Sequence, residues 1–233
     1  RKLIFCYLFI QFGNNAFTQK NDTLFKLQWI DIDSNIIQQN LPKSALTKVN
    51  VLYQKSKQIQ NQQQIIKCLI YKLSLEDVVF ENKPNNAIIF LENELATTKN
   101  EDAKSILYCL LANRYQNYFN SNRWRYFNRS KTNESKTNDI ETWSADDFNE
   151  AITMNYLKSI ENASLLQTIN LDNYKSIIVK GNTRNLRPTL YDILMHDALD
   201  YFKTGNYYLT KPAYAFELND IKALSTSNDF VNH

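Results

Sequence analysis

The chain has 233 residues, of which 43% are hydrophobic and 22% charged, so it holds enough apolar material for one large domain or two small ones. Its 27 basic and 24 acidic residues are interspersed and give a net charge of +3, which is typical of a solvated surface and not of a nucleic-acid-binding one. The three glycines lie too far apart to build a phosphate-binding loop. Glycine and proline are also too scarce for a β-sandwich, so an all-α fold is expected.

The first residues resemble a secretory signal. Residues 1 and 2 are basic, residues 3–10 are apolar, and Ala16 and Thr18 supply small side chains ahead of Gln19. The apolar run is too short to cross a bilayer as a helix, which takes about 20 residues. We therefore expect residues 1–18 to be a signal peptide and the protein to be exported to the periplasm or cell surface. A buried first helix is the alternative.

Residues 19–120 carry helical periodicity almost throughout. Residues 42–59, which begin after Leu41 with Pro42, and residues 65–73 each place their apolar positions on one stripe, and the polar turn between them predicts an antiparallel hairpin. Further helices are expected to start at Pro84 and near Asn100. An irregular but helix-compatible apolar set precedes them: Leu24, Leu27, Trp29, Ile30, Ile36 and Ile37.

The spacing of these helices predicts how they pack. Helix starts recur at intervals of about 20 residues, roughly half of a helical-hairpin repeat of about 34 to 47 residues. We therefore predict stacked antiparallel helical hairpins in a repeat-like, tetratricopeptide-like array. The Trp, Leu-Gly and Tyr signature of a true tetratricopeptide repeat is absent.

The periodicity breaks at residues 121–142, an aromatic and basic segment followed by a loop. Arg123 to Arg129 interleaves three arginines with three aromatic residues, and residues 130–138 are polar. We expect Trp124 to be buried as an anchor, the arginines to pair with carboxylates, and the polar stretch to be exposed. The alternative is a grip on single-stranded nucleic acid by stacking and phosphate contacts. The balanced charge of the chain favours the structural interpretation.

Residues 143–205 form a second predicted helical region. Ser144 and Asp147 have the spacing of a capping box, flanked by Trp143 and Phe148 as a hydrophobic staple. A shorter helix is expected over residues 171–179, ending at Gly181.

Two further segments complete the chain. Thr189 and Asp192 predict the start of an amphipathic helix that ends at Gly205. Residues 206–233 are expected to be mostly irregular, with a short helix possible over 218–224.

The sequence nominates no catalytic, cofactor-binding or metal-binding residue, and we do not expect an enzyme. Cys68 and Cys109 lie in apolar helical contexts and are expected to be buried free thiols, with a disulfide as the alternative. His196 and Asp197 are adjacent on a helix and point about 100° apart, which does not suit a catalytic dyad.

Paired carboxylates and metal ligands give no site either. Asp146-Asp147 suits helix capping, and Asp31-x-Asp33 lacks the glycine and distal glutamate of a calcium loop. With only two histidines, a zinc site is not expected.

Several strings resemble one protein family. The segment Leu186-Arg187-Pro188-Thr189-Leu190-Tyr191-Asp192-Ile193-Leu194, followed by His196, Ala198, Leu199, Asp200 and Phe202, is similar to a recurring segment of bacterial proteins. Further matching strings lie at residues 41–46, 122–124, 139–143, 156–162 and 209–214. Together they resemble the amino-terminal helical region of alpha-2-macroglobulin-like proteins of the Bacteroidetes type, from about residue 25 to the end.

This resemblance implies a non-catalytic helical scaffold or interaction region at the amino terminus of an exported protease-trapping protein. The chain would then be a fragment whose partners are downstream macroglobulin-type domains and, through the parent, proteases, with no nucleic acid and no cofactor. Many members trap proteases with a Cys-x-Glu-Gln thioester, but neither Cys68 nor Cys109 is followed by that motif. The rival hypothesis is an independent helical-repeat protein of the periplasm or cell surface that binds a peptide or glycan.

Overall fold

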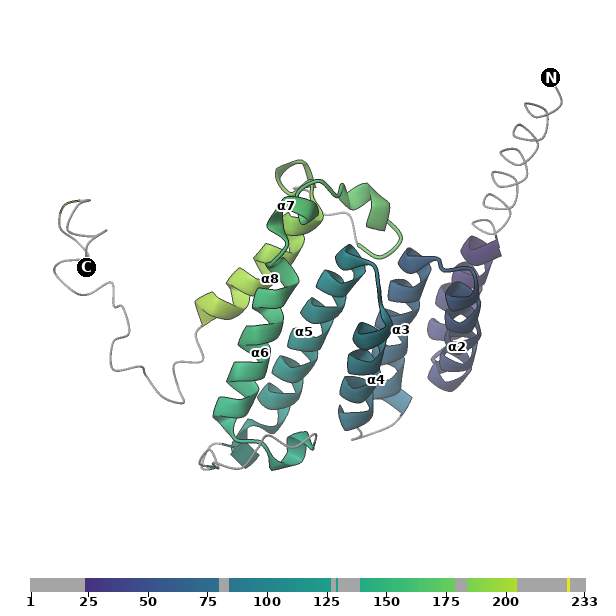
Figure 1. Ribbon diagram of the computed structural model, residues 1–233. Helices are drawn as coiled ribbons and strands as arrows, with labels where there is room; N and C mark the ends of the chain where they lie inside the picture. Colours follow the sequence, from purple (N-terminus) through teal and green to yellow (C-terminus); the bar gives the residue numbers. More distant parts are fainter. Residues whose placement is uncertain are drawn as a thin grey trace, which may run out of the picture.

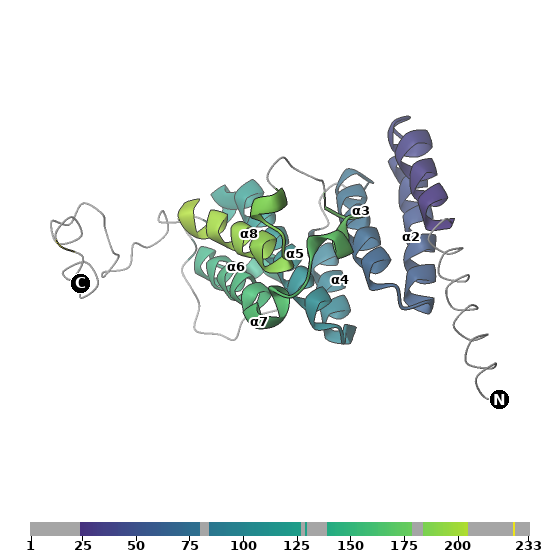
Figure 2. The same cartoon turned by 90° about the horizontal axis from the view of Figure 1, so that it is seen from above.

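The computed structural model describes residues 24–79, 84–126, 129, 139–178, 184–204 and 226, and its main elements are helices that run in alternate directions across the molecule (Figures 1 and 2). Residues 24–30 form a first helix that continues as the π-helix η1 (Asp31–Ile37). Then follow α2 (Pro42–Gln58), α3 (Gln62–Val79), α4 (Pro84–Thr97), α5 (Glu101–Tyr126), η2 (Ile140–Thr142), α6 (Ala145–Ile160), α7 (Ala163–Leu166), η3 (Leu171–Tyr174), η4 (Arg184–Leu186) and α8 (Leu190–Thr204). The predicted all-α array of antiparallel hairpins is confirmed.

The α2–α3 hairpin forms as predicted: α2 lies within one residue of its predicted bounds, and α3 extends beyond the predicted stripe at residues 65–73. Pro42 occupies the first turn of α2, where its missing N–H costs no hydrogen bond. The connection turns sharply because Gln60 adopts a left-handed backbone with φ of 55°. Asn61 then caps α3 by accepting a hydrogen bond from the backbone N–H of Gln64 at 3.2 Å.

The first helix buries a different face from the one expected. Phe25, Trp29 and Ile32, spaced at i, i+4 and i+7, form its buried stripe. The helix lies at one end of the array (Figure 2), so it has a neighbour on one side only and buries one stripe. The side chain of Ile36 lies outside the described residues, and four of the other apolar residues predicted for this helix are exposed: Leu24, Leu27, Ile30 and Ile37.

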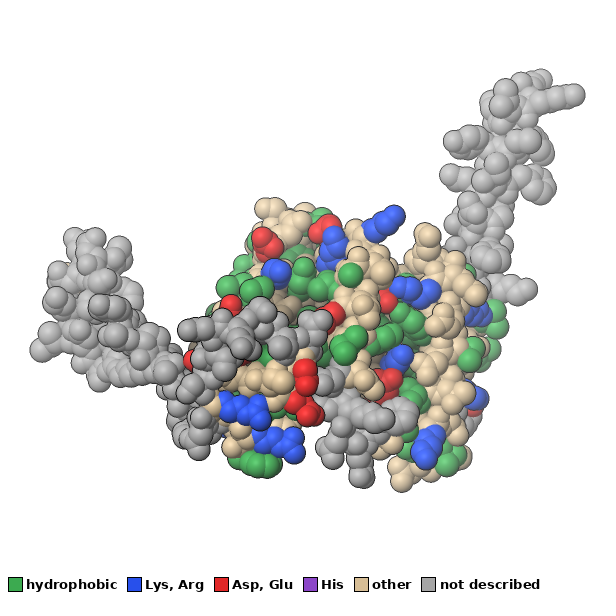
Figure 3. Space-filling view, turned by 60° about the horizontal axis from the view of Figure 1, so that its bottom comes forward, with side chains coloured by type: hydrophobic (Ala, Val, Ile, Leu, Met, Phe, Trp, Pro, Cys, Tyr) green, Lys and Arg blue, Asp and Glu red, His purple; other side chains and the backbone are tan. Residues whose placement is uncertain are grey.

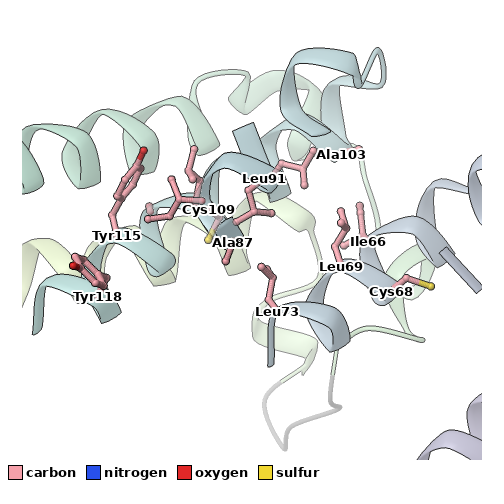
Figure 4. Packing of buried hydrophobic residues seen from close by; sticks show 14 of the residues in the cluster. Ile66, Cys68, Leu69, Leu73, Ala87, Leu91, Ala103, Cys109, Tyr115 and Tyr118 are labelled. Carbon is pink, nitrogen blue, oxygen red and sulfur yellow. The ribbon is translucent and has the colours of Figure 1, made fainter. Parts of the chain in front are cut away.

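A continuous core joins α3, α4 and α5. Figure 4 shows Leu69 and Leu73 of α3 facing Leu91 of α4, with Ala103 and Tyr115 continuing the apolar layer along α5. All five residues are buried. The side-by-side packing of these three helices fixes the surface that their ends present together.

Helix α5 is longer than the periodicity predicts. It begins as expected, with Asn100 accepting a hydrogen bond from the N–H of Ala103 at 2.8 Å, but it continues to Tyr126 and does not end near residue 120. At Asn122 the backbone leaves helical geometry (φ −118°, ψ 16°), and the Asn122 amide donates to the carbonyl of Tyr118 at 2.9 Å. Tyr126 is 1% exposed and its hydroxyl lies 3.0 Å from that of Tyr118, which anchors the last turn. The predicted segment 121–142 therefore begins as helix.

The start of α6 confirms the predicted capping box and staple. The Ser144 hydroxyl accepts from the N–H of Asp147 at 3.2 Å, and the Asp147 carboxylate accepts from the N–H of Ser144 at 2.9 Å. The rings of Trp143 and Phe148 lie 5.0 Å apart, as a hydrophobic staple requires. These contacts fix the direction in which α6 packs against α5.

The helix predicted over residues 171–179 is much shorter in the described residues. Only Leu171 to Tyr174 are helical, as η3, and residues 175–178 form turns and a bend. The N–H of Leu171 donates to the carbonyl of Pro188, and the N–H of Leu190 donates to that of Ile169, both at 2.9 Å. These two backbone hydrogen bonds hold the segment against the start of α8.

Helix α8 begins with the predicted Thr189 and Asp192 cap, in which the N–H of Thr189 donates to the Asp192 carboxylate at 2.8 Å. The expected helix ends at Gly181 and Gly205, the expected signal peptide at residues 1–18 and nearly all of the expected tail at residues 206–233 lie outside the described residues.

Candidate functional site

A groove lies at the end of the helices that faces the viewer in Figure 3. It has a volume of about 710 Å³ and lies between the end of α3, the start of α4, the second half of α5 and η2. We call it the α3–α5 groove. Its lining residues are Lys72, Glu76, Asp77, Asn86, Ala87, Phe90, Arg114, Asn117, Tyr118, Ser121, Asn122, Arg125 and Glu141.

The groove carries equal numbers of basic and acidic side chains, and ion pairs arrange four of them. Arg114 of α5 and Asp77 of α3 form a two-pronged pair, in which Nη1 donates to Oδ2 at 2.6 Å and Nη2 donates to Oδ1. Lys72 Nζ lies 3.8 Å from Oε1 of Glu76 and 3.8 Å from the centre of the Phe90 ring. These contacts tie α3 to both α4 and α5 across the groove.

The Glu76 carboxyl is partly buried in this groove. Desolvation raises the pKa of Glu76, while the charges of Lys72 and Arg114 act in the opposite direction and Asp77 adds to the rise. A carboxyl group in such a position holds its proton more readily than one in water. It is available as an acceptor to a ligand that brings its own N–H donors.

Neutral polar side chains complete the lining. Asn86 lies near the start of α4, and Asn117 and Ser121 lie four residues apart on the exposed side of α5. The sequence analysis missed this site, because its residues come from three α-helices and η2 and are 69 positions apart at the extremes (from 72 to 141). The only local signal is the polar stripe of α5 that Asn117 and Ser121 share.

The aromatic and basic segment divides into a buried and an exposed part. Tyr126 is the aromatic anchor, whereas Trp124 is 75% exposed, so the prediction that Trp124 is buried is wrong. The two side chains are two residues apart on a helix, about 200° around its axis, so only one of them can face α6.

This segment borders a second hollow. Trp124 lies with Arg125, Tyr126, Arg129 and Glu141 around a pocket of about 390 Å³, which we call the Trp124 patch. Arg125 and Glu141 also line the α3–α5 groove, so the two surfaces adjoin.

Cys68 and Cys109 are buried and free, as predicted. Burial raises the pKa of Cys68 to about 12. The Cys109 thiol lies 3.4 Å from Oδ2 of Asp197 on α8, and burial together with that carboxylate raises the pKa of Cys109 well above its usual range. A thiol that holds its proton so firmly is a poor nucleophile.

The carboxylate pairs have structural partners. Asp147 belongs to the α6 cap, Asp31 pairs with Lys48 of α2, and Asp33 accepts a hydrogen bond from the hydroxyl of Tyr71 at 2.9 Å. Within the part of the chain that the structure describes, no three His, Cys, Asp or Glu side chains gather as a metal site would require.

Comparison with known proteins gives no relative: no family model, no curated protein and no solved structure matches the chain. Among the described helices, none combines the length and the apolar character that crossing a bilayer requires. The case for a function therefore depends on the groove and the patch beside it.

Proposed function

We propose that this chain is a non-catalytic helical interaction region and that the α3–α5 groove binds an extended segment of polypeptide. The lining of the groove carries the proposal, because amides, hydroxyls and paired charges from three helices surround about 710 Å³. This volume falls in the range of about 300 to 1,000 Å³ that is typical of ligand sites. Amides and hydroxyls both donate and accept hydrogen bonds, as the backbone of an extended peptide requires.

The ion pairs of the groove support the same function. The Arg114–Asp77 pair and the Lys72–Glu76 contact hold their side chains in place before a ligand arrives, which reduces the ordering that binding must impose. Ala87 is buried and Phe90 half-buried at the floor of the groove, where they offer a small apolar surface to one side chain of the ligand.

A titration with defined peptides tests this proposal. The probes are three fluorescein-labelled dodecapeptides with a common framework of Gly, Ser, Thr and Leu and net charges of minus two, zero and plus two. Their binding is measured by fluorescence anisotropy. Asn117→Arg places a long cation in the groove and is expected to weaken binding at least about tenfold. Asn120→Arg, at an exposed position of α5 outside the groove, is the matched control and should bind as the unaltered chain does. Equal affinities of the two variants, or no binding of any probe, would contradict the proposal.

We further propose that this region belongs to an exported alpha-2-macroglobulin-like protease-trapping protein, and that the groove binds a segment of the parent's downstream domains. The support is the sequence resemblance, several of whose strings coincide with helix starts: residues 41–46 enter α2 and residues 186–194 carry the cap of α8. Such strings are informative about packing and not about catalysis.

The complete coding sequence of the gene distinguishes this parent from the rival. Macroglobulin-type domains encoded after His233 would support the trapping protein, and a stop codon directly after it would support an independent repeat protein of the periplasm or cell surface. Amino-terminal sequencing of the protein from the periplasmic and surface fractions tests export. A mature chain that starts at Gln19 is the expected result, and one that retains residues 3–10 would contradict it.

A further inference from the structure

The Trp124 patch presents a large aromatic side chain that the fold itself does not use. Trp124 is 75% exposed, the highest value among the large hydrophobic residues in the described part of the chain. Its backbone is nevertheless well held, because Tyr126 in the same last turn of α5 is buried against Phe148 and contacts the hydroxyl of Tyr118. A rigidly presented tryptophan beside arginines has the composition of a binding hot spot.

One arginine lies over the exposed ring of Trp124, and a second lies over the neighbouring ring of Tyr126. The guanidinium carbon of Arg125 lies 5.2 Å from the centre of the Trp124 ring, and that of Arg129 lies 5.1 Å from the centre of the Tyr126 ring. Arg129 also donates a hydrogen bond to the backbone carbonyl of Glu141, which fixes its position. An arginine that lies over a ring keeps N–H groups at its edge, in the fork that suits a carboxylate.

From these features we propose that the Trp124 patch binds an acidic polypeptide segment that carries an aromatic residue. The aromatic side chain packs on Trp124, and carboxylates on either side of it pair with Arg125 and Arg129. This inference rests on the proposed function of the α3–α5 groove, since Arg125 and Glu141 line both surfaces and one extended segment can cross from one to the other.

Charge decides between an acidic peptide and a nucleic acid. The patch holds two arginines against the single carboxylate of Glu141, so it favours an anion. The adjoining groove, however, presents Glu76 and Asp77 as well as Glu141. A single-stranded nucleic acid carries a phosphate at every step and would meet these carboxylates where it crossed from the patch into the groove. A peptide can place its few carboxylates at the arginines and neutral residues elsewhere.

The test uses the whole chain and a fluorescein-labelled dodecapeptide of Gly, Ser and Thr that ends in Asp-Phe-Asp. Two matched peptides, ending in Asn-Phe-Asn and Asp-Gly-Asp, lack the carboxylates and the ring respectively, and a twelve-nucleotide thymidine strand represents nucleic acid. We expect the Asp-Phe-Asp peptide to bind at least about tenfold more tightly than either matched peptide and than the oligonucleotide. Its affinity should fall with added salt, because ions screen exposed charge pairs.

Variants assign this binding to the patch. Trp124→Ala should weaken binding of the Asp-Phe-Asp peptide about tenfold, and Arg125→Gln and Arg129→Gln should weaken it about fivefold each. Leu186→Ala, at a side chain that is 72% exposed on η4, and Arg187→Gln, at an exposed arginine beside it, are matched controls and should leave affinity unchanged. The melting temperature of Trp124→Ala should also stay unchanged.

Several outcomes would overturn the inference. One is oligonucleotide binding that exceeds peptide binding and is lost in Trp124→Ala. Equal affinity for the Asp-Phe-Asp and Asn-Phe-Asn peptides would contradict the proposed pairing of the peptide carboxylates with Arg125 and Arg129. If Asn117→Arg abolishes binding and Trp124→Ala has no effect, the groove remains a peptide site and the patch does not. If neither substitution matters, the proposed function fails together with this inference.

Discussion

Replacing Phe148 with alanine tests the packing between α5 and α6. Phe148 is 0% exposed and its ring lies 5.8 Å from that of Tyr118, 5.4 Å from Phe119, 4.9 Å from Tyr126 and 5.0 Å from Trp143. It is the one residue of this group whose ring contacts all the others. Truncation removes the common partner of four rings.

The expected loss is large on the scale of a protein's stability. A buried Phe→Ala substitution costs about 3 to 5 kcal/mol. Each aromatic pair adds about 0.5 to 1.5 kcal/mol beyond the buried area, so four lost pairs place Phe148→Ala near the upper end, at about 4 to 5 kcal/mol. For a chain of this size, each kcal/mol shifts the melting temperature by about 2 to 4 °C, and we expect a fall of about 8 to 20 °C.

Urea unfolding followed by circular dichroism at 222 nm measures this loss, with a thermal melt alongside. The control is Trp124→Ala, which removes a larger ring from an exposed position and should change stability by no more than about 0.5 kcal/mol. A loss below about 1 kcal/mol for Phe148→Ala, or a similar loss in both variants, would refute the packing argument.

Further predictions concern the cap, the buried ionisable groups and proteolysis. Ser144→Ala should lower the free energy of unfolding by about 1 kcal/mol through loss of the α6 cap. Ser74→Ala, on the exposed side of α3, should change it far less, and equal losses in urea melts would contradict the capping role. In a Cys6→Ser chain, Cys68 and Cys109 should react slowly with Ellman's reagent at pH 8 and rapidly in urea, whereas fast reaction of the folded chain would refute their burial. The free energy of unfolding should fall as pH rises from about 9 to 12, because the unfolded Cys68 thiol ionises near its ordinary pKa of 9.0 while the folded one stays neutral up to about 12. Tyr71, raised from 10.0 to about 12 by burial and its bond to Asp33, acts in the same direction, and flat stability over this range in urea titrations would contradict both assignments. The chain alone should neither cleave casein nor form a covalent adduct with trypsin or subtilisin, and either result on a gel or in a digestion assay would reveal a missed site.

Local signals in the sequence predicted local structure well. The Ser144–Asp147 and Thr189–Asp192 caps form as their spacing indicates, because a capping box depends on four consecutive residues and little else. The end of α5 is different. It depends on Tyr126, which packs against Phe148 of a separate helix, α6.

Burial was harder to predict, because it depends on where neighbours lie. The first helix has apolar residues on more than one side, and its contact with the next hairpin selects Phe25 for the core and leaves Leu27 exposed. In α5 the position of the neighbouring helix likewise buries Tyr126 and leaves Trp124 exposed. The groove could not be predicted at all, since residues such as Asp77 and Arg114 meet only after three helices have packed.

The distribution of charge also bears on whether this fold recognises or transforms its ligand. Its buried thiols, and partly buried hydroxyls such as that of Tyr71, have raised pKa values, so at neutral pH they keep their protons and serve as packing or hydrogen-bonding groups. The side chains that line the α3–α5 groove are instead held by partners across helices, as Arg114 is by Asp77. Fixed charges with matched partners orient a ligand but supply no activated nucleophile. The paired charges of the groove are therefore consistent with the proposed role in recognition.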